Sequence, residues 1–308
     1  MIKPMLATLV NQPFDDKNWI YEIKWDGFRA IAEIRNKHVS LYSRNQLSFN
    51  EKFPAVIKAL EKISKNMVLD GEIVVLDQKG KSHFQLIQNF QETGEGILAY
   101  YVFDILSLGS KDLRKLPLIE RKKILKLVLP KSKIIKYSDH IVKHGKGFYK
   151  VALQKDLEGI MAKNSQSLYY SGRRTKEWLK IKIHKQQEAV IGGFTAPRGG
   201  RKKFGALVLG VYEHGKLVYI GHTGGGFNEQ SLGSVYSKLK PLATTKSPFA
   251  ISPKTNAPVT WVKPKLVCEV VFGEWTADGH MRQPIFLGLR PDKKPQEVIR
   301  ELPYEKRA

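Results

Sequence analysis

The chain has 308 residues, enough for two domains, and no apolar stretch approaches the roughly 20 residues that cross a bilayer. Its 52 Lys and Arg residues exceed its 29 Asp and Glu residues, giving a formal charge of +23. This excess favours nucleic acid as partner over an anionic membrane surface or a device for solubility alone. A single cysteine, Cys268, excludes an intrachain disulfide and a zinc ribbon. Its apolar neighbours predict a buried thiol in a reducing cytoplasm, and the first residues show no signal-peptide pattern.

Strand and helix patterns alternate through the first 185 residues. Strands joined by a polar turn at Asn36-Lys37 precede a helix that begins with Pro54, and a strand–turn–strand pattern follows around Asp70-Gly71. The later elements predicted from periodicity are a short helix at 82–91, a buried strand at 97–108, a helix at 118–129, a helix running through Gly159 into a strand at 147–164, and a strand at 177–183. We expect most of the cations of 111–150 to lie on a solvated helix face.

The composition changes near 184–188, where "HKQQE" precedes short strands and glycine turns. One helix near 228–242 interrupts about five strands, and the Pro-, Ser- and Thr-rich stretch 245–259 is predicted to be a surface loop. This pattern is typical of a small barrel such as the OB-fold. We therefore predict an α+β domain with antiparallel sheets at 1–185 and an all-β OB-fold domain at 186–308.

The segment "YEIKWDGFRA" places one lysine, Lys24, inside an apolar strand pattern that breaks at Asp26-Gly27. For most strand lysines the plain explanation holds, namely that the ammonium group reaches out to water. Here the flanking residues are apolar, the strand ends beside Lys24, and acidic residues and Arg29 lie close in the sequence. A buried lysine flanked by cations can lose its proton and attack a carbonyl carbon or a phosphorus atom. Lys24 is therefore a candidate nucleophile.

Attack on phosphorus also needs carboxylates for a divalent metal, cations for the phosphate and a platform for the base. Glu72 and Glu158 each lie beside a glycine at a strand edge and are candidate metal ligands, although each alone resembles an ordinary turn residue. Lys180 and Lys182 share one face of a strand, which suits either a phosphate or a solvated surface. Two further candidates have plain alternatives in core packing or a surface position: Phe103 as the base platform and Arg44 at a strand end.

Taken in order, these segments resemble the ATP-dependent DNA ligases, in particular the ligase domain of bacterial DNA ligase D. "EIKWDGFR" matches the nucleotidyltransferase signature K-x-D-G-x-R, and "SRN", "LDGEIV", "YYVFDIL", "EGIMAKN" and "EWLKIK" match the motifs that follow it. "RQPIFLGLR" at 282–290 matches the last motif, R-x-P-x-F-x-G-x-R, in the second domain, and "PMLAT" and "PFDD" near the start are further similarities. A lone K-x-D-G is a weak signal, but the ordered set is specific, and no motif position departs from the family pattern.

The resemblance implies a nucleotidyltransferase (adenylation) domain with covalent chemistry. Lys24 would attack the α-phosphate of ATP to form lysyl–AMP, AMP would pass to the 5′-phosphate at a nick, and the 3′-hydroxyl would displace it. Glu72 and Glu158 would hold Mg²⁺, for which Mn²⁺ can substitute. The implied catalytic residues are Lys24, Asp26, Arg29, Lys180 and Lys182. The implied nucleotide-binding residues are Glu22, Ile23, Lys24, Arg29, Arg44, Glu72, Phe103, Glu158, Lys180, Lys182 and Arg282.

Within these sets the resemblance assigns particular contacts. Glu22 would accept a hydrogen bond from the adenine amino group, and Phe103 would stack on the base. Arg29 and Glu72 would contact the ribose, and Arg29 and Arg44 would also contact the ends of the nick. The two lysines of "EWLKIK" would neutralise the α-phosphate.

The second domain carries Arg282 and Arg290, for both of which the resemblance implies a function. That domain would turn over ATP during self-adenylylation and then grip the DNA minor groove, so 184–188 is expected to be a hinge. DNA binding would depend on phosphates and duplex shape rather than base sequence. The basic segments 111–150 and 197–205 are those we expect to contact the DNA backbone.

The implied substrate is nicked or broken double-stranded DNA. The resemblance further implies a monomer acting in non-homologous end joining with Ku and separately encoded repair polymerase and nuclease, away from membranes, in the cytoplasm at the nucleoid. Two alternatives stay open. An RNA ligase or an mRNA-capping-type nucleotidyltransferase shares K-x-D-G, and a non-catalytic basic DNA-binding protein would explain the charge without chemistry.

Overall fold

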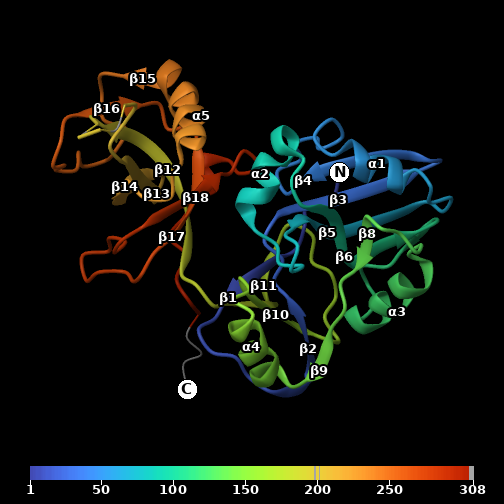
Figure 1. Cartoon of the computed structure of the whole chain (residues 1–308). Helices are drawn as coiled ribbons and strands as arrows, with labels where there is room; N and C mark the ends of the chain where they lie inside the picture. The colour runs from blue at the N-terminus through green and yellow to red at the C-terminus, as the bar shows by residue number, and fades with distance from the viewer. Residues whose placement is uncertain (198, 201, 305–308) are drawn as a thin grey trace. The chain divides into compact units, whose positions relative to one another are not determined.

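The computed structural model describes residues 1–197, 199–200 and 202–304, and the chain divides into two compact units (Figure 1). The N-terminal unit comprises residues 1–183 with the described C-terminal residues 302–304, and the C-terminal unit comprises residues 184–301. The strands of the N-terminal unit are β1 (Leu6–Leu9), β2 (Asp16–Ile23), β3 (Phe28–Arg35), β4 (His38–Ser43), β5 (Met67–Leu76), β6 (Ile97–Leu108), β7 (Lys111–Asp112), β8 (Ile135–Tyr137), β9 (Ile141–Lys143), β10 (Gly159–Asn164) and β11 (Arg174–Lys182). Its helices are α1 (Pro54–Leu60), α2 (Phe84–Thr93), α3 (Leu118–Val128) and α4 (Gly145–Gln154).

Two sheets face each other in the N-terminal unit. The first sheet has the order β1–β11–β10–β2–β9, and the second has the order β4–β3–β5–β6–β7. The pairs are antiparallel, as predicted, except that β1 runs parallel to β11 and β8 runs parallel to β6. Ile20 and Trp178 of the first sheet share a buried cluster with Ile31 and Phe103 of the second. In Figure 1, α4 lies against the first sheet and α3 beside β6.

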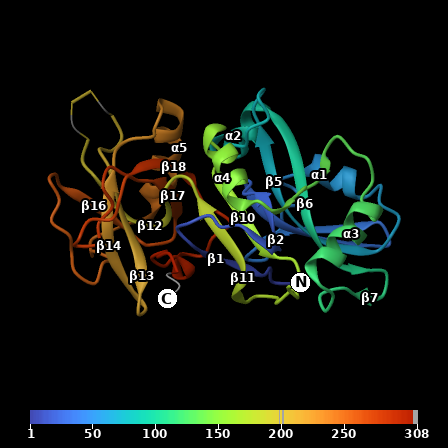
Figure 2. The ribbon, with the colours of Figure 1, turned by 90° about the horizontal axis from the view of Figure 1, so that it is seen from below.

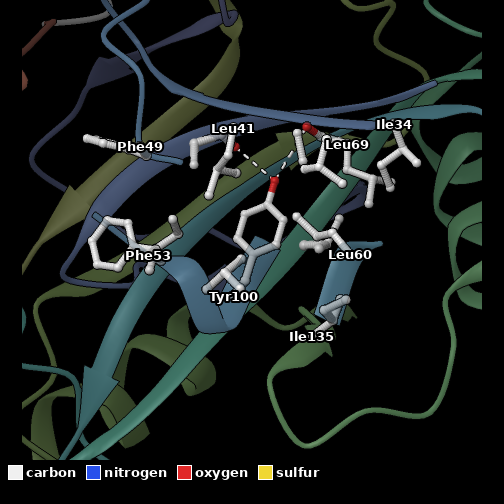
Figure 3. Close-up of a cluster of buried hydrophobic side chains, with 14 of the residues drawn as sticks. Ile34, Leu41, Phe49, Phe53, Leu60, Leu69, Tyr100 and Ile135 are labelled. Carbon is white, nitrogen blue, oxygen red and sulfur yellow. Dashed lines mark hydrogen bonds between the residues drawn. The ribbon is translucent and has the colours of Figure 1, made fainter. Parts of the chain in front are cut away.

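The far face of the second sheet carries its own core, which α1 helps to cover. Figure 3 shows Leu41, Phe53 and Leu60 around the ring of Tyr100 in this cluster. The Tyr100 hydroxyl donates to the carbonyl oxygen of Ala30 at 2.9 Å, so the buried phenol is satisfied and β6 is tied to β3. The sheet that carries half of the candidate site is therefore packed on both faces.

One sequence prediction for this sheet is wrong. The chain does not turn at Asp70-Gly71, because Met67–Leu76 forms the single strand β5. An added Cβ on Gly71 would lie 2.5 Å from the carbonyl oxygen of Tyr101 and 2.6 Å from the ring of Tyr100. Glycine is required here because the backbone and a ring of the neighbouring strand lie so close. The Asp-Gly pair also occurs in turns, which is why the sequence pattern predicted a turn here.

The C-terminal unit consists mainly of one antiparallel sheet. Its strands are β12 (Gln186–Thr195), β13 (Leu207–Glu213), β14 (Lys216–Thr223), β15 (Ala243–Thr244), β16 (Val259–Val262), β17 (Val267–Val271) and β18 (Ile285–Leu289); α5 (Glu229–Leu239) and the short 3₁₀ helices η1 (Lys240–Leu242) and η2 (Pro295–Glu297) complete it. β12 pairs with β13 on one edge, and on the other edge with β17 and then β16. Figure 2 shows α5 beside the sheet. Cys268 is buried, as predicted.

Most of the segment predicted to be a hinge lies within a strand. Gln186, Gln187 and Glu188 of the segment 184–188 belong to β12 and pair with β17. The side-chain amide of Gln187 donates to the carbonyl oxygen of Ile299 at 3.0 Å, which fixes this segment within the C-terminal unit. Only residues 183–185 separate β11 from β12. Any hinge between these strands is confined to those residues, because the rest cannot change backbone angles without breaking sheet hydrogen bonds.

The chain returns to the N-terminal unit after residue 301. The backbone N–H of Tyr304 donates to the carbonyl oxygen of Leu9 at 2.8 Å. The ammonium group of Lys176 donates to the Tyr304 hydroxyl at 2.5 Å and lies 3.8 Å from the centroid of its ring. A hydrogen bond and a cation–π contact thus hold the described end of the chain against β1 and β11.

Most cations of the basic segment 111–150 are exposed, as expected. By contrast, Arg121 and Lys122 are buried. In the segment 197–205, Arg198 and Arg201 lie outside the described residues. No helix in the part of the chain described is both long and apolar enough to cross a membrane.

The close approach at Gly71 gives a direct test of β5. We expect Gly71→Ala to lower the free energy of unfolding by about 1–3 kcal/mol, because backbone atoms cannot move away as a flexible side chain would. Gly147→Ala is the matched control, since its added Cβ meets nothing within 4 Å and alanine favours a helix, so stability stays level or rises by up to about 1 kcal/mol. Urea unfolding of both variants would measure this, and equal stabilities would contradict it.

Candidate active site

Three neighbouring strands bring the signature residues into one row. Gly159 of β10 pairs with Lys182 of β11, and its carbonyl oxygen accepts from the backbone N–H of Lys24, just past the end of β2, at 3.0 Å. Paired residues in an antiparallel sheet point to the same face, so Lys24 and Lys182 project together. Glu22 and Lys180 stand two residues earlier on their strands and share that face. It is the face that packs on the second sheet.

The amine of Lys24 is engaged in an ion pair. It donates to Oε1 of Glu158, and the side chains are only 19% and 5% exposed. Burial lowers the pKa of Lys24, and so does the nearby Lys182, but the carboxylate of Glu158 outweighs both and the pKa lies above its ordinary value. The amine in this state is protonated. The depressed pKa expected from the flanking cations is therefore not found.

The second carboxylate oxygen of Glu158 is left without a partner. Oε2 is buried and makes no hydrogen bond to any described residue. In the residues that the structure describes, no group of three or more His, Cys, Asp and Glu side chains could hold a metal ion. Mg²⁺ commonly takes one or two protein carboxylates and completes its shell with water and phosphate oxygens. The lone oxygen of Glu158 suits such a cation.

Asp26 and Gly27 hold the end of the Lys24 segment in place. A carboxylate oxygen of Asp26 accepts from the backbone N–H of Phe84, the first residue of α2, at 3.1 Å. An added Cβ on Gly27 would lie 2.1 Å from the carbonyl oxygen of Ile73 in β5. The aspartate thus caps a helix that lacks a cap of its own, and the glycine lets the chain pass close to the second sheet. These contacts give Asp26 a structural role beside the predicted catalytic one.

Arg29 projects from β3 toward the space between the sheets in a fixed geometry. Its guanidinium donates to Asp70 from Nε at 3.0 Å and from Nη2 at 2.7 Å, and the Tyr169 hydroxyl donates to the same carboxylate at 2.7 Å. The guanidinium carbon lies 5.3 Å from the ring centroid of Phe103. Glu72 pairs directly with Arg29 across β3 and β5. The fork-shaped pairing pre-orients a cation next to an aromatic platform and a carboxylate.

Phe103 is placed by an irregularity in β6. Asp70 pairs with Asp104 while Gly71 pairs with Val102, so Phe103 is the extra residue of a bulge. A bulge redirects the side chain of its extra residue, and here the ring points toward the first sheet, where it meets Trp178 edge-on at 6.1 Å. Lys163 of β10 lies 4.2 Å from the Phe103 ring centroid. The ring predicted to stack on the base is thus turned out of the regular strand by the bulge, and Arg29 and Lys163 lie against it.

Glu22 is buried between two lysines. Oε1 accepts from Lys122 at 2.6 Å and Oε2 accepts from Lys163 at 2.8 Å. Burial alone would raise the pKa of Glu22, but the two ammonium groups reverse the effect and the pKa lies below its ordinary value. The carboxylate is therefore ionised and can only accept hydrogen bonds.

The remaining predicted residues lie on or beside these strands. Ile23 ends β2, paired with Ile160 of β10, and Lys180 pairs with Met161 one row from Lys182. Arg44 follows β4 at the start of a tight turn, in which the backbone N–H of Ser43 donates to the carbonyl oxygen of Leu47 at 2.8 Å. The N-terminal unit thus brings together the predicted groups on two facing sheets: Glu22, Lys24, Glu158, Lys180 and Lys182 on one, and Arg29, Glu72 and Phe103 on the other.

The two arginines of the last motif, Arg282 and Arg290, differ in exposure and in their ion pairs. Arg282 is 64% exposed and donates to Glu274 at 2.7 Å. Arg290 is 11% exposed and pairs with Glu269 at 2.5 Å and with Asp292 at 2.8 Å. Arg290 is therefore a buried centre of ion pairs in the C-terminal unit, and the function expected for it stays a prediction. Arg282 remains accessible.

Several residues of the site were missed from the sequence. Lys163 is a lysine in an apolar strand, which is the same signal that singled out Lys24. Arg121 and Lys122 stand three and four residues after Leu118 and so face the core with it, which the helical spacing could have shown. Asp70 was obscured by its apparent turn. Nothing in the sequence would have found Tyr169, which reaches Asp70 from a distant loop.

The ion pair of Lys24 gives a pKa prediction. We expect Glu158→Gln to lower the pKa of Lys24, because burial and Lys182 then act without the carboxylate that opposes them. Competitive labelling with acetic anhydride, followed peptide by peptide across pH, reports the unprotonated amine. Exposed Lys123 serves as the internal control, and an unchanged midpoint for Lys24 would contradict the interpretation.

Comparison with known proteins shows which family the chain resembles. A family described as "ATP dependent DNA ligase domain" matches residues 4–182, and one described as "ATP dependent DNA ligase C terminal region" matches residues 200–293. The chain is 39% identical over 311 residues to "Multifunctional non-homologous end joining protein LigD" of Pseudomonas aeruginosa, covering 98% of this chain and 37% of the relative. The protein of the same name from Mycolicibacterium smegmatis is 39% identical, with 97% and 39% covered. The chain thus spans well under half the length of these relatives.

A solved structure extends the similarity to three dimensions. "Mycobacterial DNA ligase D complexed with ATP and MES" matches with a TM-score of 0.73 and 34% identity, covering 97% of this chain and 98% of that one. The match confirms the predicted fold class, an α+β nucleotidyltransferase domain followed by an OB-fold domain. Together with the family match over more than half of its length, these similarities show that the chain belongs to the ATP-dependent DNA ligase family.

Proposed function

We propose that the chain is an ATP-dependent DNA ligase that works through AMP bound covalently to Lys24. The observation that carries the proposal is the row of Lys24, Gly159 and Lys182 across β2, β10 and β11, with Glu158 on the lysine amine. Facing it are Arg29 and the Phe103 platform. This arrangement offers one amine nucleophile, a second cation for phosphate and an aromatic surface for a base. Family membership supports ATP as the nucleotide.

The first step makes a phosphorus–nitrogen bond. The unprotonated Nζ of Lys24 attacks the α-phosphorus of ATP, the bond from that phosphorus to the bridging oxygen breaks, and pyrophosphate leaves. Turning the Glu158 carboxylate away from Lys24 would leave the amine beside Lys182 in a dry site, and both factors lower the pKa of Lys24. The ion pair thus keeps the Lys24 amine protonated, and breaking the pair allows the amine to lose its proton and act as the nucleophile. Lys182 and Lys180 neutralise charge on the α-phosphate.

The next two steps transfer the AMP and seal the strand. A 5′-phosphate oxygen attacks the AMP phosphorus and displaces Lys24, which regains an amine. The DNA 3′-hydroxyl then attacks the 5′-phosphate, forming a phosphodiester and releasing AMP. Arg29, already oriented by Asp70, is suited to a ribose hydroxyl or a phosphate, and Arg44 to the nick.

A divalent cation fits the site at Glu158. The supporting observation is the buried, unpaired Oε2 of that carboxylate, with Glu72 as the second predicted ligand. Mg²⁺, or Mn²⁺ in its place, would neutralise phosphate charge when bound.

The proposed substrate is nicked or broken double-stranded DNA. The charge of +23 suits binding to phosphates, and the similarity to proteins named for non-homologous end joining supports a repair role. We extend the proposal to a monomer that acts at the nucleoid in the cytoplasm with Ku, a repair polymerase and a nuclease. An RNA ligase or a capping enzyme would instead prefer an RNA nick or GTP.

Loss of the nucleophile tests the proposal. With labelled α-phosphate ATP and Mg²⁺, the wild-type protein should carry label through a denaturing gel and GTP should give none. Lys24→Ala should carry none, because it lacks the amine that bonds to the α-phosphorus. The variant should still bind nicked DNA nearly as well as the wild type. Label on Lys24→Ala would move the nucleophile elsewhere. No label on folded wild-type protein freed of AMP would point to a non-catalytic DNA-binding protein.

The exposed arginine of the last motif gives a second test. We propose that Arg282 contacts the pyrophosphate of ATP. Arg282→Ala should then slow self-adenylylation at least tenfold yet leave sealing of a pre-adenylylated nick near the wild-type rate, because pyrophosphate takes no part there. Its ion pair with Glu274 is exposed, so stability should change by less than about 1 kcal/mol. Equal losses in both reactions would contradict this role.

A further inference from the structure

Lys122 of α3 is a buried lysine that the chemistry above does not use. Its ammonium group is 1% exposed and donates to Glu22 at 2.6 Å, to the carbonyl oxygen of Ser138 at 3.0 Å and to that of Phe103 at 3.4 Å. A lysine ammonium has three protons, and these three acceptors come from three different segments of the N-terminal unit. Such a fully engaged lysine fixes the relative positions of the groups it binds.

The neighbouring residue, Arg121, also forms hydrogen bonds to β6. Arg121 is fully buried and donates to Asp104 from Nε and Nη2, each at 2.8 Å. Arg121 and Lys122 therefore hold Asp104 and Phe103, the two residues at the bulge, side by side. Side chains of α3 thus fix the bulge that turns the Phe103 ring, and Lys122 of the same helix also binds Glu22.

We propose that Lys122 is a positioning residue for recognition of the nucleotide base, which makes the site select a purine that carries a 6-amino group. The inference rests on the proposed function, in which Glu22 and Phe103 receive the base. Lys122 fixes one oxygen of Glu22 while Lys163 fixes the other. The carboxylate stays ionised and accepts an amino hydrogen, whereas a protonated or displaced carboxyl would tolerate a keto oxygen or a hydrogen at that position.

The test is a competition between two nucleotides for one lysine. Wild-type protein and Lys122→Met receive equal ATP and purine riboside triphosphate, which lacks only the 6-amino group, and mass spectrometry of the Lys24 peptide gives the ratio of the two adducts. The ratio does not depend on how much protein is active. We expect the wild type to favour ATP and Lys122→Met to lose about tenfold or more of that preference, the range for a hydrogen bond to a charged group.

Two controls separate positioning from damage. Lys123→Met on the same helix, whose side chain is 64% exposed, should keep the wild-type ratio. Glu22→Gln should lose preference like Lys122→Met, and combining the two should cause no further loss, since Lys122 acts through Glu22. The double variant also removes the charges of Lys122 and Glu22 together, so comparing its ratio with that of Glu22→Gln tests Lys122 even if Lys122→Met alone does not fold.

The outcomes distinguish the two proposals. A fall in both adducts with an unchanged ratio in Lys122→Met would make Lys122 a merely structural residue and overturn the inference. A further loss on adding Lys122→Met to Glu22→Gln would also overturn it. A wild-type protein that forms neither adduct would instead defeat the proposed ligase chemistry.

Discussion

The candidate site depends on the pairing register of β10 between β2 and β11. That register sets Gly159 beside both Lys24 and Lys182, and the alternation of strand residues then puts Glu22 and Lys180 on the same face. A slip of one residue would turn each of these side chains to the opposite face, toward the core under α4. Gly159 has a φ of 155° and an added Cβ would lie 2.2 Å from the carbonyl oxygen of Ile181. Glycine is therefore required at the point where the row forms.

The space between the two sheets is unusual in holding many charges at low exposure. Each buried charge has an opposite partner: Glu22 with two lysines, Arg29 with Asp70, and Arg121 with Asp104. A buried pair contributes little net stability, but removing one partner costs about 3–5 kcal/mol because the other is left uncompensated. These pairs thus specify positions more than they stabilise the fold. Glu158 pairs with Lys24 through one oxygen only, and its other oxygen lies where the proposed chemistry needs a ligand.

How far the sequence predicts this structure can be traced residue by residue. The strand that ends at Lys24, the bulged strand of Phe103 and the strand of Lys180 and Lys182 follow from periodicity, and the ordered motifs imply which of them meet. The pattern around Gly71 failed because glycine permits both a turn and a close approach. The burial of Arg121 and Lys122 was not predicted, because most cations of the basic helix were expected to face solvent. The contacts of Tyr169 and the elevated pKa of Lys24 depend on tertiary neighbours, which no local pattern contains.

The hydrogen bond between Tyr304 and Leu9 changes how the C-terminal unit is connected. Because the chain leaves the N-terminal unit after residue 183 and rejoins it at residue 302, the C-terminal unit is an insertion with two attachment points. A unit attached to the rest of the chain at one point can rotate about any axis. A unit attached at two points rotates mainly about the line that joins them. A larger rotation of the C-terminal unit requires the contacts of Tyr304 with β1 and Lys176 to break. These contacts of the last described residues therefore restrict the rotation of that unit.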